Sequence, residues 1–76
     1  MTAAKMTAEI NKLNSFQIRS LRRQLSGRGQ AAAISVNERI SAVTVEFVHA
    51  NGKRFAHHLM LGPRGRIVYH EIARVA

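Results

Sequence analysis

The side chains of this 76-residue chain with the most chemical potential are four histidines, and they raise the question of a metal site. They are His49, His57, His58 and His70. Zinc takes three or four protein ligands, but the chain has no cysteine and no aspartate. Glu46 and Glu71 are the only carboxylates close to these histidines in the sequence. We therefore expect no metal and no other cofactor.

Catalysis has equally little support from the residue types. General acid–base chemistry needs two positioned titratable groups, and the acidic residues are four scattered glutamates. None of the serines lies in a pattern typical of the sharp turn that exposes a catalytic nucleophile. We expect a protein that is not an enzyme.

Glycines beside arginines are the second pattern of interest, because glycine-rich loops can bind phosphate. Gly27-Arg28-Gly29 has this composition and follows a helical segment. Phosphate is attracted to the N-terminal end of a helix, whereas glycine and arginine are typical of its C-terminal end. Helix capping therefore explains Gly27 without a ligand.

A basic stripe on the same helical segment is harder to explain by capping. Its residues are Lys12, Arg19, Arg22 and Arg23. They fall within about 100° of one another on a helical wheel, opposite an apolar arc. They extend well beyond the last helical turn, and Glu9 is the only helical acid that could pair with them. The stripe is either a solvated face or a contact surface for an anionic partner.

The overall charge favours such a partner. Twelve Lys and Arg residues against four acids give a net charge of +8, and nine of the twelve are arginines. Arginine binds phosphate through two parallel hydrogen bonds, and a positive field attracts nucleic acid. Only four aromatic residues are present, so contact with the phosphate backbone is favoured over base stacking. The residues expected to make these contacts are Lys12, Arg19, Arg22, Arg23, Arg28, Lys53, Arg54, Arg64 and Arg66.

One helix is expected to carry the stripe. Thr7 can cap its N-terminus, and nothing breaks helical geometry from there to Ser26. An alternative ends one helix and caps a second at Asn14-Ser15, which would give a helical pair, as in a helix-turn-helix. The unbroken apolar arc favours a single helix over residues 7–26, preceded by a flexible tail over residues 1–6.

The second half of the chain reads as a β-meander with strands over about residues 41–49, 54–61 and 66–75. A three-residue Ala-Asn-Gly loop after His49 would set Phe47 opposite Phe55 and keep large apolar residues on one face. A four-residue turn over 62–65 would set His57 opposite His70, and a slip of one residue would set His58 there. Residues 30–37 are ambiguous between a strand and a loop.

The face of this sheet away from the helix is expected to be too apolar for water. It would carry Ala42, Thr44, Val48, Ala56, Met60, Ile67 and Tyr69. A second copy of the chain is expected to cover it, because a domain of this size buries a small core. The residues expected in this self-association are Val48, Met60, Ile67 and Tyr69.

These observations predict an α+β protein with one amphipathic helix on a three-stranded antiparallel meander (αβββ), forming one domain over residues 7–76 and a homodimer. The function hypothesis is a cytoplasmic nucleic-acid-binding accessory or regulatory protein, with DNA favoured over RNA. The alternative is a protein-interaction module, such as a small inhibitor or assembly subunit of a phage or plasmid, that docks an acidic protein through its apolar sheet face. Neither a signal peptide nor a membrane span is expected.

Overall fold

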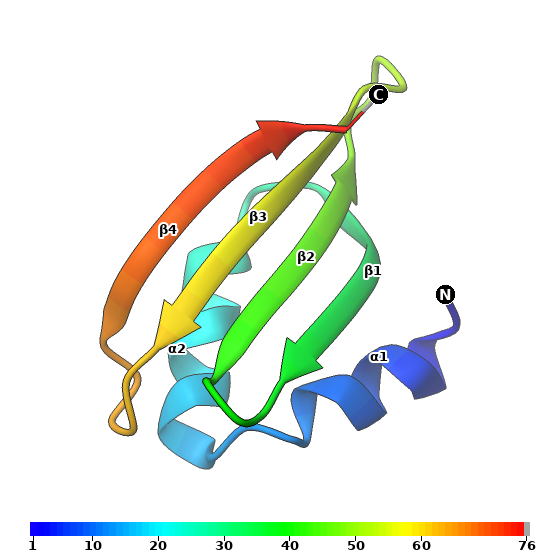
Figure 1. Ribbon diagram of the computed structural model, residues 1–76. Coiled ribbons are helices and arrows are strands. Elements are labelled where there is room, and N and C mark those ends of the chain that lie inside the picture. Colours follow the sequence, from blue (N-terminus) through cyan, green and yellow to red (C-terminus); the bar gives the residue numbers. More distant parts are fainter. Residues whose placement is uncertain (76) are drawn as a thin grey trace.

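The computed structural model describes residues 1–75, which form two helices and one four-stranded antiparallel sheet. The elements are α1 (Ala3–Ile10), α2 (Ser15–Leu25), β1 (Gln30–Asn37), β2 (Ala42–Val48), β3 (Arg54–Leu61) and β4 (Ile67–Arg74). The strands follow one another in the order β1-β2-β3-β4. Figure 1 shows α2 behind the sheet and α1 along the side of β1. The class is α+β, as expected from the sequence.

The helical region differs from the single helix predicted over residues 7–26. Thr2 Oγ1 accepts a hydrogen bond from Lys5 N at 3.2 Å, so α1 begins at Ala3 within the stretch expected as a tail. A capping box then starts α2, because Asn14 Oδ1 accepts from Gln17 N at 2.9 Å and Gln17 Oε1 accepts from Asn14 N at 3.0 Å. The alternative with two helices meeting at Asn14-Ser15 is therefore the observed one.

A fourth strand corrects the three-stranded prediction. The ambiguous segment 30–37 forms β1 and pairs with β2, with Ile34 opposite Val45 and Val36 opposite Val43. Ile34 and Val36 are buried, and the register shifts between Ala31 and Ala33. The burial of these two residues outweighs the poor strand propensity of the alanines that precede them.

The β2–β3 hairpin has the predicted register. Phe47 lies opposite Phe55, and the pairs farther along the strands follow the same alignment. His49 N donates to Lys53 O and Gly52 N donates to His49 O, both at 2.9 Å, which closes the three-residue loop. Gly52 has a φ of +81°, a conformation that glycine adopts readily and that such loops require.

The β3–β4 pairing differs from both predicted registers. A register shift between Met60 and Leu61 sets Leu61 opposite Ile67 and His57 opposite Ile72 rather than His70. Ile67 therefore packs against the core on the helix side and was wrongly placed on the other face.

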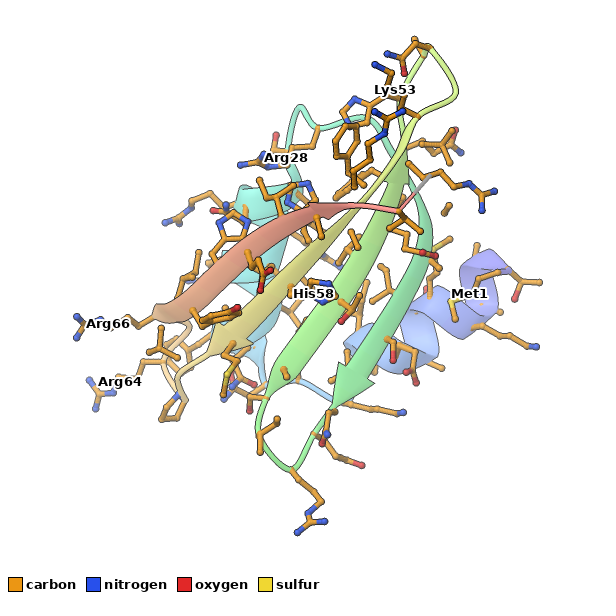
Figure 2. All side chains as sticks on the ribbon, turned by 45° about the horizontal axis from the view of Figure 1, so that its top comes forward. Met1, Arg28, Lys53, His58, Arg64 and Arg66 are labelled. Carbon is orange, nitrogen blue, oxygen red and sulfur yellow. The ribbon has the colours of Figure 1, made fainter. Side chains whose placement is uncertain are left out.

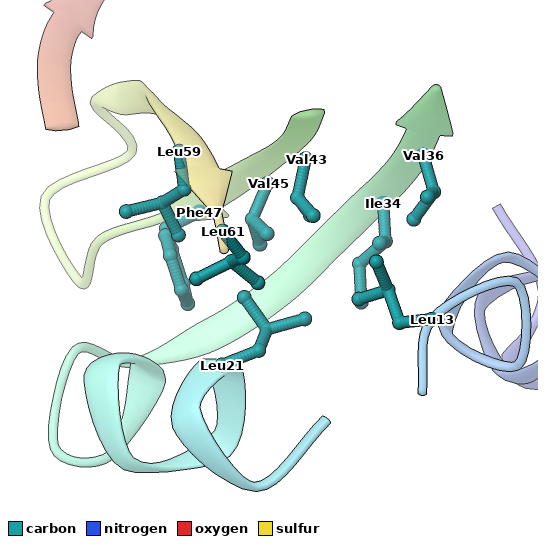
Figure 3. Packing of buried hydrophobic residues seen from close by; sticks show 9 residues of the cluster. All are labelled: Leu13, Leu21, Ile34, Val36, Val43, Val45, Phe47, Leu59 and Leu61. Carbon is teal, nitrogen blue, oxygen red and sulfur yellow. The ribbon is translucent and has the colours of Figure 1, made fainter. Parts of the chain in front are cut away.

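The core lies between the helices and one face of the sheet (Figure 3). Leu21 on α2 and Val45 on β2 are at most 1% exposed. Each such aliphatic side chain contributes about 1.5–3 kcal/mol on burial. The buried cluster comprises Leu13, Leu21, Ile34, Val36, Val43, Val45, Phe47, Leu59 and Leu61.

The opposite side of the sheet, here called the open face, is more polar than expected. Thr44 Oγ1 and His58 Nδ1 lie 3.0 Å apart on it, and Tyr69 donates a hydrogen bond to Glu71. Glu46 also belongs to this face by strand alternation. The residues predicted for this face lie on it, apart from Ile67, and these polar groups lie among them. Coverage of this face by a second copy stays a prediction.

Candidate nucleic-acid interface

Helix α2 separates an apolar side from a basic side. Leu21 is buried, while Ile18 and Leu25 are partly buried against the core. The side chains that point away from the core are exposed arginines. They are Arg19, Arg22 and Arg23, three members of the predicted stripe.

The turn between β3 and β4 is held against the start of α2. Gly65 N donates to Gly62 O at 2.9 Å, and Asn14 Nδ2 donates to Pro63 O at 2.8 Å. A Cβ atom at Gly65 would lie 2.5 Å from Phe16 O, so only glycine permits this approach. The turn therefore meets the helix backbone directly.

Gln17 reinforces this junction from inside the protein. Its side chain is 5% exposed, and its Nε2 atom donates to Leu61 O at 3.3 Å, Gly62 O at 3.2 Å and Ser41 Oγ at 3.1 Å. One amide thus joins α2 to the ends of β2 and β3. The signal for it in the sequence is the spacing of three residues from Asn14, which is the capping-box spacing.

This junction gives the turn arginines a fixed place beside the helix. Arg64 and Arg66 flank Gly65 and are exposed, and Figure 2 shows both projecting into solvent at one end of the sheet. Phe16 and Ser20, the helix residues that Gly65 contacts, lie three positions before Arg19 and Arg23. The contact therefore brings the turn to the side of α2 next to Arg19 and Arg23. The exposed arginines of α2 and of the turn are together called the arginine surface: Arg19, Arg22, Arg23, Arg64 and Arg66.

The arginine surface has two further features. An open depression of about 410 Å³ is lined by Ser15, Ile18, Arg19 and Arg22. Phe16, on the same helix, is 55% exposed. Helix α2 therefore presents cations, a hollow and one apolar ring to solvent.

The acidic residues lie on other parts of the chain. Glu38 is in the β1–β2 turn, Glu46 and Glu71 are on the open face, and Glu9 is on α1. Among the described residues, none of the four glutamates forms a salt bridge with an arginine of the arginine surface. The positive charge of this surface is therefore not neutralised within the chain.

Lys12 does not continue the stripe. It lies in the connection between the helices and forms a salt bridge with Glu9. Glu9 Oε1 also accepts a hydrogen bond from Val36 N at 3.1 Å, and both contacts lower the pKa of this carboxyl. The break before α2 is the physical reason, since it turns Lys12 towards the β1 edge.

The remaining predicted contact residues lie at the other end of the molecule. Arg28 Nε donates to Gln24 O at 2.8 Å, which satisfies a carbonyl near the C-terminus of α2 as helix capping predicts. Lys53 is at the tip of the β2–β3 hairpin, far from Arg64 and Arg66 in Figure 2, and Arg54 begins β3. The nine predicted residues therefore do not form a single site.

Two of the histidines meet, although not in the predicted register. His57 Nδ1 lies 3.4 Å from His70 Nε2, with the rings stacked diagonally across β3 and β4. Burial, followed by the charge of Arg28, lowers the pKa of His57. His57 also lines a shallow pocket of about 210 Å³, but within residues 1–75 no three His, Cys, Asp or Glu side chains gather as metal ligands.

Of the residues expected to mediate self-association, Met60 and Tyr69 lie opposite each other on β3 and β4, while Val48 and Ile67 lie apart from them. Val48 lines a pocket near Met1 and Met6, Met60 is half-buried and Ile67 belongs to the core. Tyr69 alone among the four is both exposed and on β4. Self-association through these residues stays a prediction.

Within residues 1–75, neither helix has the length and apolar character needed to cross a membrane. Known protein families, curated proteins and solved structures give no match to this chain.

Proposed function

We propose that the protein binds nucleic acid by contacting the phosphate backbone through the arginine surface. The observation that carries this proposal is the contact between α2 and the β3–β4 turn, two elements that carry five exposed arginines with no glutamate paired to them among residues 1–75. The approach of Gly65 to Phe16 fixes the two groups relative to each other. Because the backbone segments that carry them are held in place, less freedom is lost when both groups contact one phosphate backbone.

The style of binding follows from the residue types. Arginines favour contacts with phosphate oxygens, which set the position of the protein but carry no sequence information. Phe16 is a single exposed ring, whereas single-strand-binding platforms stack several bases on neighbouring aromatics. The proposed ligand is therefore a duplex, with DNA as the first choice to test.

The experiment compares two triple variants with the same loss of charge. The first replaces Arg19, Arg22 and Arg23 with glutamine. The second replaces Lys53, Arg54 and Arg74, three exposed cations at the opposite end of the sheet. Fluorescence anisotropy with labelled duplex DNA, and with duplex RNA of the same sequence, measures the dissociation constant over a series of salt concentrations.

Each neutralised phosphate contributes about −0.9 to the slope of log K against log salt, so five contacts give a slope of about −4 to −5. The first triple variant should reduce this slope by about 3, while the second should change it by less than about 1. No binding of the wild type at low salt, or equal losses in the two variants, would refute the proposed interface.

One feature of the structure supports the alternative of a protein-interaction module. The open face carries polar groups, but exposed apolar residues gather on β4 and directly after it, Tyr69 of the open face among them. An acidic protein would also suit the arginine surface. If the wild-type protein binds neither duplex at low salt, an acidic protein becomes the proposed partner.

A further inference from the structure

The two edges of the sheet are treated differently by the rest of the chain. At the β1 edge, Ile34 N donates to Met1 Sδ at 3.5 Å and Val36 N donates to Glu9 Oε1 at 3.1 Å. Figure 1 shows α1 running alongside this strand. Helix α1 and the residues before it therefore cover the outward backbone groups of β1, which prevents pairing with another strand.

The β4 edge has no such cover. Helix α2 lies beneath the sheet near β4, where Gln24 Nε2 is 3.4 Å from His70 Nδ1, but it does not run along the outer side of the strand. Four of the eight large hydrophobic residues that are exposed in the described chain lie on β4 or directly after it. They are Val68 at 60%, Tyr69 at 47%, Ile72 at 50% and Val75 at 51% exposure.

The backbone of β4 is correctly arranged for pairing. Val75 N donates to Arg54 O at 2.9 Å, so the polar groups of Val75 point towards β3. Along an antiparallel strand, the backbone N–H and C=O groups of successive residues point alternately to the two sides. The backbone groups of His70, Ile72 and Arg74 therefore point outward, away from β3. No strand of the sheet lies on that side.

We propose that β4 pairs with β4 of a second copy of this chain, antiparallel and centred on Ile72, to form an eight-stranded sheet. Centring the pairing on Glu71 or on Arg74 would oppose like charges across the two-fold axis. Centring it on Ile72 sets this apolar residue against itself and sets Tyr69 against Val75. Because a strand that pairs with its own copy is self-complementary, Tyr69, Ile72 and Val75 of both copies gain apolar neighbours in one step.

The symmetry has a consequence for the proposed function. The two-fold axis of an antiparallel strand pair is perpendicular to the sheet, so both helical layers lie on the same side. Helix α2 packs under β3 and β4, and the two copies of α2 would therefore flank the axis. The dimer would then present the α2 arginines of both copies on the same side, which doubles the number that face one duplex. This step rests on the proposed nucleic-acid binding, whereas the strand pairing does not.

The first test measures oligomeric state without nucleic acid. Sedimentation equilibrium from about 10 μM to 1 mM should detect a dimer of the wild type, because a one-strand interface lies at the small and weak end of known interfaces. Ile72→Lys sets two charges against each other and should give a monomer. Ile40→Lys is the matched control, since Ile40 is 54% exposed but lies in the β1–β2 turn.

A second test reports the register. The chain has no cysteine, so Ile72→Cys introduces a single thiol. In the proposed pairing the two Cα atoms would be about 5.5 Å apart, within disulfide range, and mild oxidation should produce a covalent dimer. Ile40→Cys should not do so to the same extent.

The outcomes separate this inference from the proposed function. A wild type that is monomeric at about 1 mM, or Ile72→Lys that dimerises as well as Ile40→Lys, overturns the pairing whether or not DNA binds. Circular dichroism of Ile72→Lys confirms that the fold is retained, and mixing Ile72→Lys with Ile72→Glu should restore a dimer. Because each chain carries a charge of +8, added salt should strengthen dimerisation while it weakens DNA binding.

Discussion

Replacement of Gln17 by methionine tests how α2 and the strand ends are joined. Methionine has nearly the same length and volume, so the change removes hydrogen bonds without opening a cavity. The buried bond to Leu61 O is lost, and an unsatisfied buried carbonyl costs about 1–3 kcal/mol. The bond from Asn14 N is lost as well, and weakening the N-cap costs about 0.5–1 kcal/mol.

The expected decrease in the free energy of unfolding is therefore about 2–4 kcal/mol, and the thermal midpoint should fall by about 10–20 °C. Urea and thermal unfolding followed by circular dichroism measure both quantities. Gln24→Met is the matched control, because the Gln24 side chain makes one exposed contact on the same helix. A Gln17 variant within about 0.5 kcal/mol of the Gln24 variant would show that these hydrogen bonds do not hold the junction together.

Two further predictions concern the neighbourhood of the interface and the buried histidine. Gly65→Ala should destabilise the protein by about 2–4 kcal/mol and weaken DNA binding, because its methyl group would collide with Phe16 O. Gly52→Ala, at a φ of +81° with open space around it, should cost only about 1 kcal/mol in a denaturant titration; equal losses would contradict the contact. Because the pKa of His57 is lowered in the folded state, stability should be full above the ordinary value of 6.5 and fall as the pH drops below it. The unfolding free energy of His57→Phe should lack this decrease, and parallel pH profiles of the two proteins would contradict it.

The β2–β3 hairpin could be predicted from the sequence because its determinants are local. The Asn-Gly pair fixes the loop, and alternation of apolar residues fixes the face that each strand buries. The β3–β4 register could not be predicted in this way, since a bulge adds one residue to a strand without a distinct sequence signal. The prediction for His57 and His70 failed for this reason, although diagonal contact still brings the rings together.

The helix break was missed because the apolar arc continues across it. Leu13 follows α1 yet is buried with Leu21 of α2, so both helices contribute to one core and the periodicity does not slip. The capping box at Asn14 and Gln17 was the available signal. Residues 30–37 were ambiguous between a strand and a loop because alanine has a low strand propensity. Their pairing with β2, which no local pattern shows, makes them a strand.

For the candidate site too, local features could be predicted from the sequence and distant contacts could not. The α2 arginines could be assigned to one face from helical periodicity alone. Their approach to Arg64 depends on Gly65 meeting Phe16, a contact between residues almost fifty positions apart that no local pattern encodes. Sequence reasoning therefore found the cations but not which of them share a surface.

The helix break also explains why the arginine surface and the bare strand edge lie near each other. A single helix over residues 7–26 would be about 30 Å long, at least as long as a strand of eight residues, which spans about 27 Å. Such a helix could cover one line across the sheet, and either the β1 edge or the face beneath β3 and β4 would be left open. Division at Asn14 lets α1 cover the β1 edge while α2 lies under β3 and β4, beside the β3–β4 turn. The same division takes Lys12 out of the stripe and leaves β4 as the edge without cover, so the surface proposed for nucleic acid and the edge proposed for pairing have a common structural origin.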